Sequence, residues 1–155
     1  MKKSLVINSL FVVLLSIAFI GCSETDGISV VPAFDAIYCT PTSPAAGDSI
    51  TLTAHQAQMG KLINKTSYNW TFSCQIFYDG AASRDTTFTR TVNTNYDGIS
   101  NADPVIGVYV PKNIAGDLTV TLNANYSLSG QTASGQLYGQ ATRTTRIPIK
   151  ISLNN

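Results

Sequence analysis

The chain has 155 residues, with 10 basic and 9 acidic side chains, a formal net charge of +1 and only 12% charged residues. It contains no run of Lys and Arg and no basic stripe, which argues against nucleic acid as a partner. Thr, Ser, Asn and Gln supply most of its polarity, and solvent-facing Thr is typical of half-exposed antiparallel sheets.

The start of the chain has the pattern of a secretory signal. Lys2 and Lys3 form a basic region, and the segment from Leu5 to Ile20 is apolar apart from three polar residues. A membrane-spanning helix needs about 20 apolar residues. This segment is shorter than that, so it favours a secretory signal over a span.

The residues after this segment resemble the lipobox of bacterial lipoproteins. Ile20, Gly21 and Cys22 fit that pattern, whereas Phe19 stands where an aliphatic residue is usual. The resemblance implies that residues 1–21 are removed and that the sulfur of Cys22 carries diacylglycerol, which anchors the protein in a membrane. Cleavage there would leave 134 residues (155 minus 21), enough for one domain. The alternatives are a retained anchor helix and an ordinary signal for soluble secretion.

The residues that follow Cys22 bear on the location of the protein. Position 23 is Ser, not the Asp that retains enteric lipoproteins in the inner membrane, so the resemblance implies the outer membrane of a Gram-negative cell. Glu24 and Asp26 resemble the acidic export signal of some surface lipoproteins. The leaflet, periplasmic or surface-exposed, stays open. Residues 22–29 are expected to form a lipidated tether and residues 30–155 the folded domain.

The mature chain reads as strands separated by turns, with no convincing helix. In Ser67–Asp79 and in Leu118–Leu128, apolar and polar residues alternate over the whole segment. The longest loop is expected at Ala57–Thr66, with Met59, Leu62 and Ile63 as potentially exposed residues. The expected strands are Val30–Cys39, Ile50–His55, Ser67–Asp79, Arg84–Asn93, Ile106–Val110, Leu118–Leu128 and Leu137–Leu153.

Seven strands at near-regular spacing predict an all-β fold, a single antiparallel β-sandwich. Three segments, PAAGDSITLTA, the strand around Trp70, and GDLTVTLNANY, resemble bacterial immunoglobulin-like domains of the PKD or fibronectin type. The resemblance implies that Trp70 fills the core between two sheets. No cysteine pair links the second and sixth strands, and Tyr126 lies late in the sixth strand, so a variant sandwich is expected.

Two cysteines remain if Cys22 is acylated. Cys39 and Cys74 form a disulfide or stay as two separate buried thiols, because both states are compatible with a protein outside the cytoplasm. The sequence leaves the two alternatives open.

The residues needed for catalysis are scarce. His55 is the only histidine, and it falls on the outward side of a regular strand, as a solvated surface residue. Glu24 is the only Glu and lies in the tether, and no zinc-ligand spacing is present. We therefore expect no catalytic activity and no cofactor, with a hydrolase as a remote alternative.

Three aspartates lie in loops that meet at one end of an immunoglobulin-like sandwich. Asp48, Asp79 and Asp117 are weak candidates for a Ca²⁺ site, because that cation takes six to eight oxygen ligands. The alternative, which the sparse acidic pattern favours, is three independent turn aspartates.

These observations predict a lipid-anchored binding or scaffolding module of the cell envelope. Its ligand is expected on loops, namely Ala57–Thr66 and Ser127–Gly135. The alternative is a glycan-binding accessory lipoprotein of a surface polysaccharide uptake system, with Phe77, Tyr96 and Tyr138 as candidates for stacking on sugars.

Overall fold

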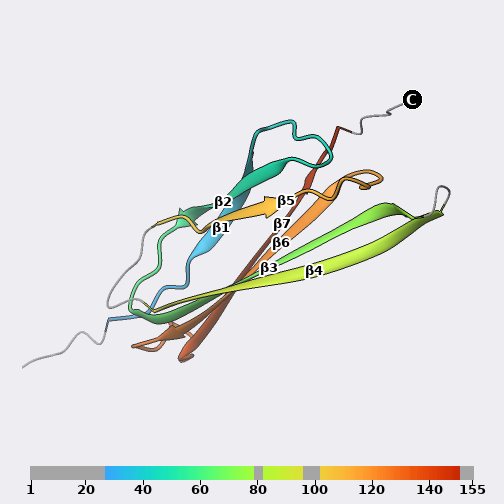
Figure 1. The fold of residues 1–155 in the computed structure, drawn as a ribbon. Coiled ribbons are helices and arrows are strands. Elements are labelled where there is room, and N and C mark those ends of the chain that lie inside the picture. Colours follow the sequence, from blue (N-terminus) through green and yellow to red (C-terminus); the bar gives the residue numbers. More distant parts are fainter. Residues whose placement is uncertain (1–26, 79–81, 96–101, 151–155) are drawn as a thin grey trace, which may run out of the picture.

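The computed structural model describes residues 27–78, 82–95 and 102–150, and this part of the chain forms seven β-strands and no helix. All strand pairs are antiparallel, in a sheet of order β1-β2-β5 and a sheet of order β4-β3-β6-β7 (Figure 1). The prediction of an all-β sandwich is confirmed. The strands are β1 (Ala33–Thr40), β2 (Ser49–Gln58), β3 (Ile63–Tyr78), β4 (Ala82–Asn95), β5 (Val105–Tyr109), β6 (Leu118–Leu128) and β7 (Tyr138–Ile147).

The core lies between the inward faces of the two sheets. Strand β6 has the predicted alternation along its whole length, with Leu118, Val120 and Leu122 fully buried and the residues between them partly exposed. Trp70 of β3 is 1% exposed, as expected for the residue that fills the centre of the core. Its burial removes a large apolar surface from water and is a main source of stability.

The predicted long loop at Ala57–Thr66 is wrong. Strand β2 continues to Gln58 and β3 already begins at Ile63, which is only 5% exposed. The register of β3 against β6 shifts between Ile63 and Lys65. A bulge of this kind adds one residue and moves the following side chains to the other face. The alternation of apolar and polar residues is therefore interrupted here, so the sequence pattern predicts a loop although Thr66 is a buried strand residue.

Two further strand boundaries differ from the prediction. Strand β1 begins at Ala33, because Val30 makes only an isolated bridge with Lys61. Strand β7 ends at Ile147, directly before Pro148, which has no backbone N–H for a ladder. Lys150 then bridges to Ala45, and residues 151–155 lie outside the described part.

The described chain begins at one end of the sandwich. Val30 and Lys61 exchange two backbone hydrogen bonds of 3.1 and 2.9 Å, and Ser29 N donates to the carbonyl of Gln131 at 2.9 Å. The first residues thus lie between the β2–β3 turn and the β6–β7 loop (Figure 1). Lys150 pairs with Pro44 and Ala46 beside the β1–β2 loop. In the part that the model describes, no helix is long and apolar enough to cross a membrane.

Candidate functional site

The outward face of the four-stranded sheet consists of uncharged polar side chains. The pairing registers place Thr71 of β3 beside Thr121 of β6, and Thr121 beside Thr144 of β7. On the other side Thr71 pairs with Thr89 of β4, so four threonines form one row across the sheet. Neighbouring rows have the same character. We call this surface the polar face; it comprises Ser67, Asn69, Thr71, Ser73, Thr87, Thr89, Thr91, Thr119, Thr121, Asn123, Asn125, Gln140, Thr142 and Thr144.

Hydrogen bonds between strands hold several of these side chains in place. Thr142 Oγ1 donates to Asn123 Oδ1 at 2.9 Å, and Gln140 Nε2 donates to Asn125 Oδ1 at 2.9 Å. The hydroxyls of Thr121 and Thr144 lie 3.0 Å apart. Because each asparagine accepts through its oxygen, the orientation of its amide is defined and its NH₂ donors have fixed directions.

Charged residues occur only at the two ends of the polar face. Arg146 completes the row of Ser73 and Thr119, and Lys65 lies at the opposite end, near Ser127. Designed soluble surfaces carry about 25–35% charged residues. The polar face therefore has far fewer charges than an ordinary soluble surface, although it extends over four strands.

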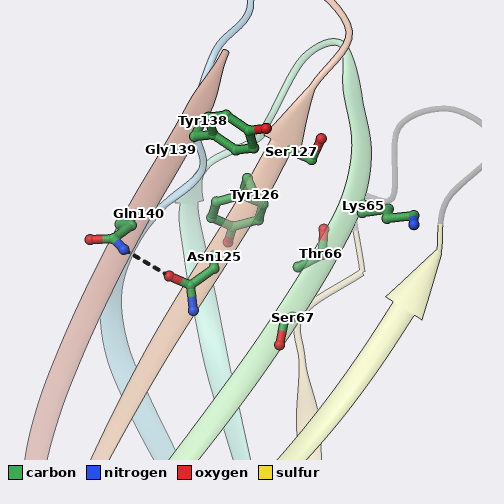
Figure 2. Close-up of a pocket in the computed structure, with 9 residues that line it drawn as sticks. All are labelled: Lys65, Thr66, Ser67, Asn125, Tyr126, Ser127, Tyr138, Gly139 and Gln140. Atoms are coloured by element: carbon green, nitrogen blue, oxygen red, sulfur yellow. Dashed lines mark hydrogen bonds between the residues drawn. The ribbon is translucent and has the colours of Figure 1, made fainter. Parts of the chain in front are cut away.

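A shallow depression lies at the Lys65 end of the polar face (Figure 2). Tyr138, the first residue of β7, lines it together with Ser67, Asn125 and Gln140, and its side chain is 73% exposed. Gly139 follows it in the strand. A Cβ at Gly139 would lie 2.2 Å from Cγ2 of Val31, so the glycine lets the first residues of the domain pack against β7.

A second, polar depression lies at the other end of the polar face. Gln75, Asp85, Asp117 and Arg146 line it, beside Ser73, Thr87 and Thr119 of the polar face. Its charges have both signs, so it does not select strongly for an ion of either sign.

The predicted aromatic ligand residues do not form one site. Phe77 and Tyr138 are both exposed, but Phe77 lies near the last residue of β3, whereas Tyr138 pairs with Ser127 beside the first residues of that strand. Phe77 is twelve positions after Lys65 in β3, which corresponds to about 40 Å along the strand. Phe77 and Tyr138 therefore cannot stack on the same sugar unit, and Tyr96 lies outside the described residues.

Of the three proposed calcium ligands, the structure describes Asp48 and Asp117. Asp48 Oδ2 accepts a 2.7 Å hydrogen bond from the backbone N–H of Ala45, which is an ordinary turn contact. Asp117 lines the depression beside Arg146, and Asp79 lies outside the described residues. Among the residues that the model describes, no group of three or more His, Cys, Asp or Glu side chains could hold a metal ion.

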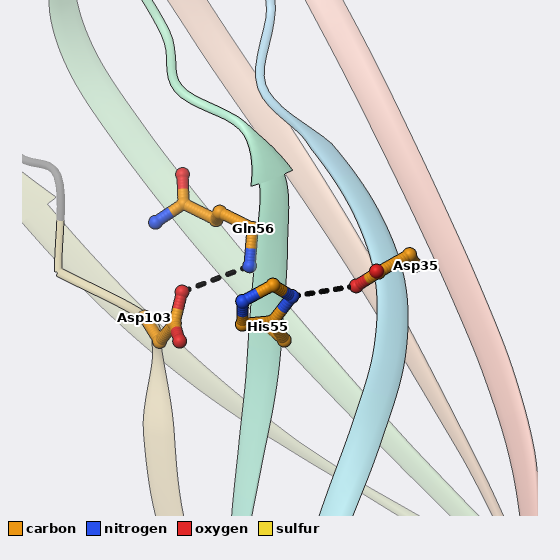
Figure 3. A network of polar contacts seen from close by, with 4 residues as sticks. All are labelled: Asp35, His55, Gln56 and Asp103. Carbon is orange, nitrogen blue, oxygen red and sulfur yellow. Dashed lines mark hydrogen bonds and ion pairs between the residues drawn. The ribbon is translucent and has the colours of Figure 1, made fainter.

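His55 lies on the surface as expected, but it has a partner. Its Nδ1 is 2.8 Å from Oδ1 of Asp35 on the neighbouring strand (Figure 3). Its ring also meets the ring of Tyr38 edge-on, with 6.1 Å between the ring centres. The hydrogen bond that His55 donates to the Asp35 carboxylate raises the pKa of His55, and the same bond lowers the pKa of Asp35. Asp103 accepts a hydrogen bond from the backbone of Gln56 at 2.8 Å, next to this pair.

Both cysteines in the described part are free thiols. Cys39 lies on β1, partly exposed, and its sulfur donates to the carbonyl of Pro41 at 3.2 Å. Cys74 is buried on β3, in the other sheet. Burial raises the pKa of both thiols, which keeps them protonated and poorly nucleophilic. Cys22, the predicted lipidation site, lies outside the described residues.

The sequence contains a signal for the polar face that was not read as a site. Each of the third, fourth, sixth and last expected strands contains at least three consecutive alternate positions that are Thr, Ser, Asn or Gln. Each strand alone looks like the solvent side of a sheet. Only the register shows that the four polar sides join into one surface.

No protein-family model matches the chain, and no curated protein matches it. Among solved structures, the chain is similar to Spo0M, a sporulation control protein from Bacillus subtilis, with 13% sequence identity and a TM-score of 0.38. The similar region covers 78% of this chain and 50% of that protein, so the chain spans about half of its length.

Proposed function

We propose that this protein is a lipid-anchored, non-catalytic binding module of the cell envelope, with an immunoglobulin-like sandwich as its folded part. The strand order supports the immunoglobulin-like assignment. Strands β1, β2 and β5 form one sheet, and β4 lies beside β3 at the edge of the other. The absence of catalysis is inferred from the scarcity of catalytic groups in the sequence, which has one histidine and one Glu. The histidine pairs with Asp35 at the surface, and the Glu belongs to the expected tether.

The observation that carries the proposal is the position of the first described residues. Gly27 stands five residues after Cys22, and five extended residues reach about 18 Å at most. A lipid on Cys22 would therefore hold the end of the sandwich that contains Ser29 and Val30 close to the membrane surface. The opposite end and both outer sheet faces would stay accessible.

The chemistry of this end supports the same orientation. Ile28, Met59 and Leu137 are large apolar residues on three segments that meet there, and all three are exposed. Lys61 is exposed in the β2–β3 turn. Apolar side chains with a nearby cation suit the interface of a bilayer that carries anionic lipids. We propose the outer membrane as the location.

Metabolic labelling with a radioactive fatty acid such as palmitate tests the anchor. The wild-type protein should carry label, and the Cys22→Ser variant should carry none. Cys39→Ser is the matched control and should be labelled like the wild type. An unlabelled wild-type protein, or label that persists in Cys22→Ser, would refute the anchor.

A second candidate function is glycan binding, as an accessory of a surface polysaccharide uptake system. The uncharged polar face with exposed Tyr138 at its end favours it. This candidate needs only the folded domain, so it is independent of lipidation.

A further inference from the structure

We propose that the polar face and Tyr138 together bind an uncharged polysaccharide, which lies along the strands from Tyr138 toward Arg146. This inference deepens the glycan-binding function and rests on it, but it does not depend on the lipid anchor. It moves the expected ligand site from the loops at the ends of the sandwich to the outer face of the four-stranded sheet.

The chemistry of the polar face fits a neutral polymer of hydroxyl groups. Thr and Ser hydroxyls both donate and accept hydrogen bonds, and the amides of Asn and Gln offer two donors and an acceptor. Sugar hydroxyls have the same dual capacity. A nucleic acid or another polyanion would need a row of cations, and a membrane would need apolar side chains. The polar face has neither.

The geometry of the polar face also suits an extended ligand. Adjacent strands lie about 4.8 Å apart, and every second residue along a strand recurs at about 6.7 Å. The cross-strand bonds Thr142–Asn123 and Gln140–Asn125 hold the side chains before a ligand arrives. Such preorganisation reduces the entropy lost on binding.

Tyr138 supplies the apolar contact that hydroxyl recognition by itself lacks. Its ring lies at the end of the polar face, above the depression formed with Asn125 and Gln140 (Figure 2). One side of a pyranose ring exposes C–H groups, which pack on an aromatic ring while the hydroxyls reach polar neighbours. Because Tyr138 is 73% exposed, such a contact would bury surface that now faces water.

The length of the site implies a preference for long chains. Arg146 is eight positions after Tyr138 in the strand β7, which corresponds to about 27 Å. Several sugar units fit along this distance, and each adds hydrogen bonds of modest strength. Affinity is therefore expected to rise with the number of units, and a monosaccharide should bind weakly.

The outer face of the other sheet provides the comparison within the same molecule. It carries Asp35, His55, Tyr38, Val105 and Tyr109, a mixture of charged, aromatic and aliphatic side chains. Tyr109 is exposed on this face, but it is not flanked by a four-stranded surface of uncharged polar side chains. It is therefore a matched control for Tyr138.

Affinity electrophoresis tests the proposal. The protein used begins at residue 22 and carries the substitution Cys22→Ser. All described contacts lie within residues 27–150, so this chain retains the whole described fold. The gels contain soluble glucan, mannan, xylan or galactan, with an acidic polysaccharide as a comparison. At least one neutral polymer should retard the protein, and the acidic one should not. No retardation by any neutral polymer, or retardation by the acidic one alone, would overturn the proposal.

Variants then locate the site by calorimetry with oligosaccharides of increasing length from the polymer that binds. Tyr138→Ala should weaken binding about ten-fold. Thr142→Val, which removes a hydroxyl from the middle of β7 at nearly constant volume, should weaken it several-fold. Tyr109→Ala should bind like the wild type. Wild-type affinity in Tyr138→Ala and Thr142→Val, or equal losses in Tyr138→Ala and Tyr109→Ala, would refute this site. Fatty-acid labelling of Cys22 tests the anchor separately.

Discussion

Nδ1 of His55 and Oδ1 of Asp35 lie 2.8 Å apart across the pair of strands β1 and β2, on the outer face of the smaller sheet. The two residues are twenty positions apart in sequence. Their contact makes the only histidine of the chain a reporter of the β1–β2 pairing, and its titration is not overlapped by another histidine.

The first prediction concerns the pH dependence of this pair. The hydrogen bond that His55 donates to the Asp35 carboxylate raises the pKa of His55. The stabilisation from this shift is therefore present in full below about pH 6.5, the pKa of an unfolded histidine, and is lost as the pH rises through the folded pKa. The pKa of Asp35 is lowered, so its contribution is lost only as the pH falls below about 4. NMR titration of His55 should give a pKa above 6.5, and Asp35→Asn should lower it. An unchanged His55 pKa in Asp35→Asn would contradict the pairing.

The second prediction concerns the contact of Gly139 with Val31. A Cβ at position 139 would lie 2.2 Å from Cγ2 of Val31, a stiff β-branched side chain, so Gly139→Ala should reduce the free energy of unfolding by about 1–3 kcal/mol. Val31→Ala removes the clashing methyl groups. The double variant should therefore be destabilised by less than the sum of the two single changes, as measured by urea unfolding. Strict additivity would show that the two residues do not touch.

The third prediction concerns the end of the sandwich that we propose to face the membrane. Met59 and Val105 are equally exposed, at 58%, but Met59 lies beside the first residues of the domain and Val105 lies on the outer sheet face. The chain from Cys22 is coupled through that thiol to maleimide lipids in vesicles that also contain brominated lipids. The fluorescence of Met59→Trp should then be quenched and shifted to the blue, and that of Val105→Trp should not.

The native Trp70 is buried and contributes a constant background to both samples. A Cys22→Ser sample measures how much protein couples to the maleimide lipids through the partly exposed Cys39. Equal quenching of the two introduced tryptophans, or quenching of neither, would contradict the proposed orientation.

The fourth prediction concerns the thiols. Cys39 and Cys74 lie in different sheets and are free. Alkylation after unfolding without reductant should therefore add two groups to the Cys22→Ser protein, as read by mass spectrometry. In the native state Cys74 should react far more slowly than Cys39, because it is buried. A mass without adducts would reveal a disulfide between them.

The inward faces of the strands could be predicted from the sequence because they follow a local rule. In β6, successive side chains point to opposite sides, so the alternation of Leu118, Val120 and Leu122 with polar residues defines the buried face without knowledge of any partner. The same rule placed Trp70 in the core. It failed at Ile63, where a bulge inserts one residue into the ladder and shifts the alternation.

The candidate site could not be predicted in this way. The sequence predicts Tyr138 as an exposed aromatic candidate, and the structure places the other described candidate, Phe77, at the opposite end of β3. The companions that the structure places beside Tyr138, Asn125 and Gln140, come from two strands and meet only through their pairing register. A shift of one residue would turn either strand's polar side inward.

From the amino-acid order alone follow the all-β class, the seven expected strands and the buried faces of β2, β5, β6 and most of β3. Alternation is a property of one strand and its contact with water. Only the tertiary structure decided which strands are neighbours, that the four polar sides form one surface and that His55 meets Asp35. Hydrogen bonds between strands join residues far apart in the chain, and their register depends on the packing of the whole sandwich.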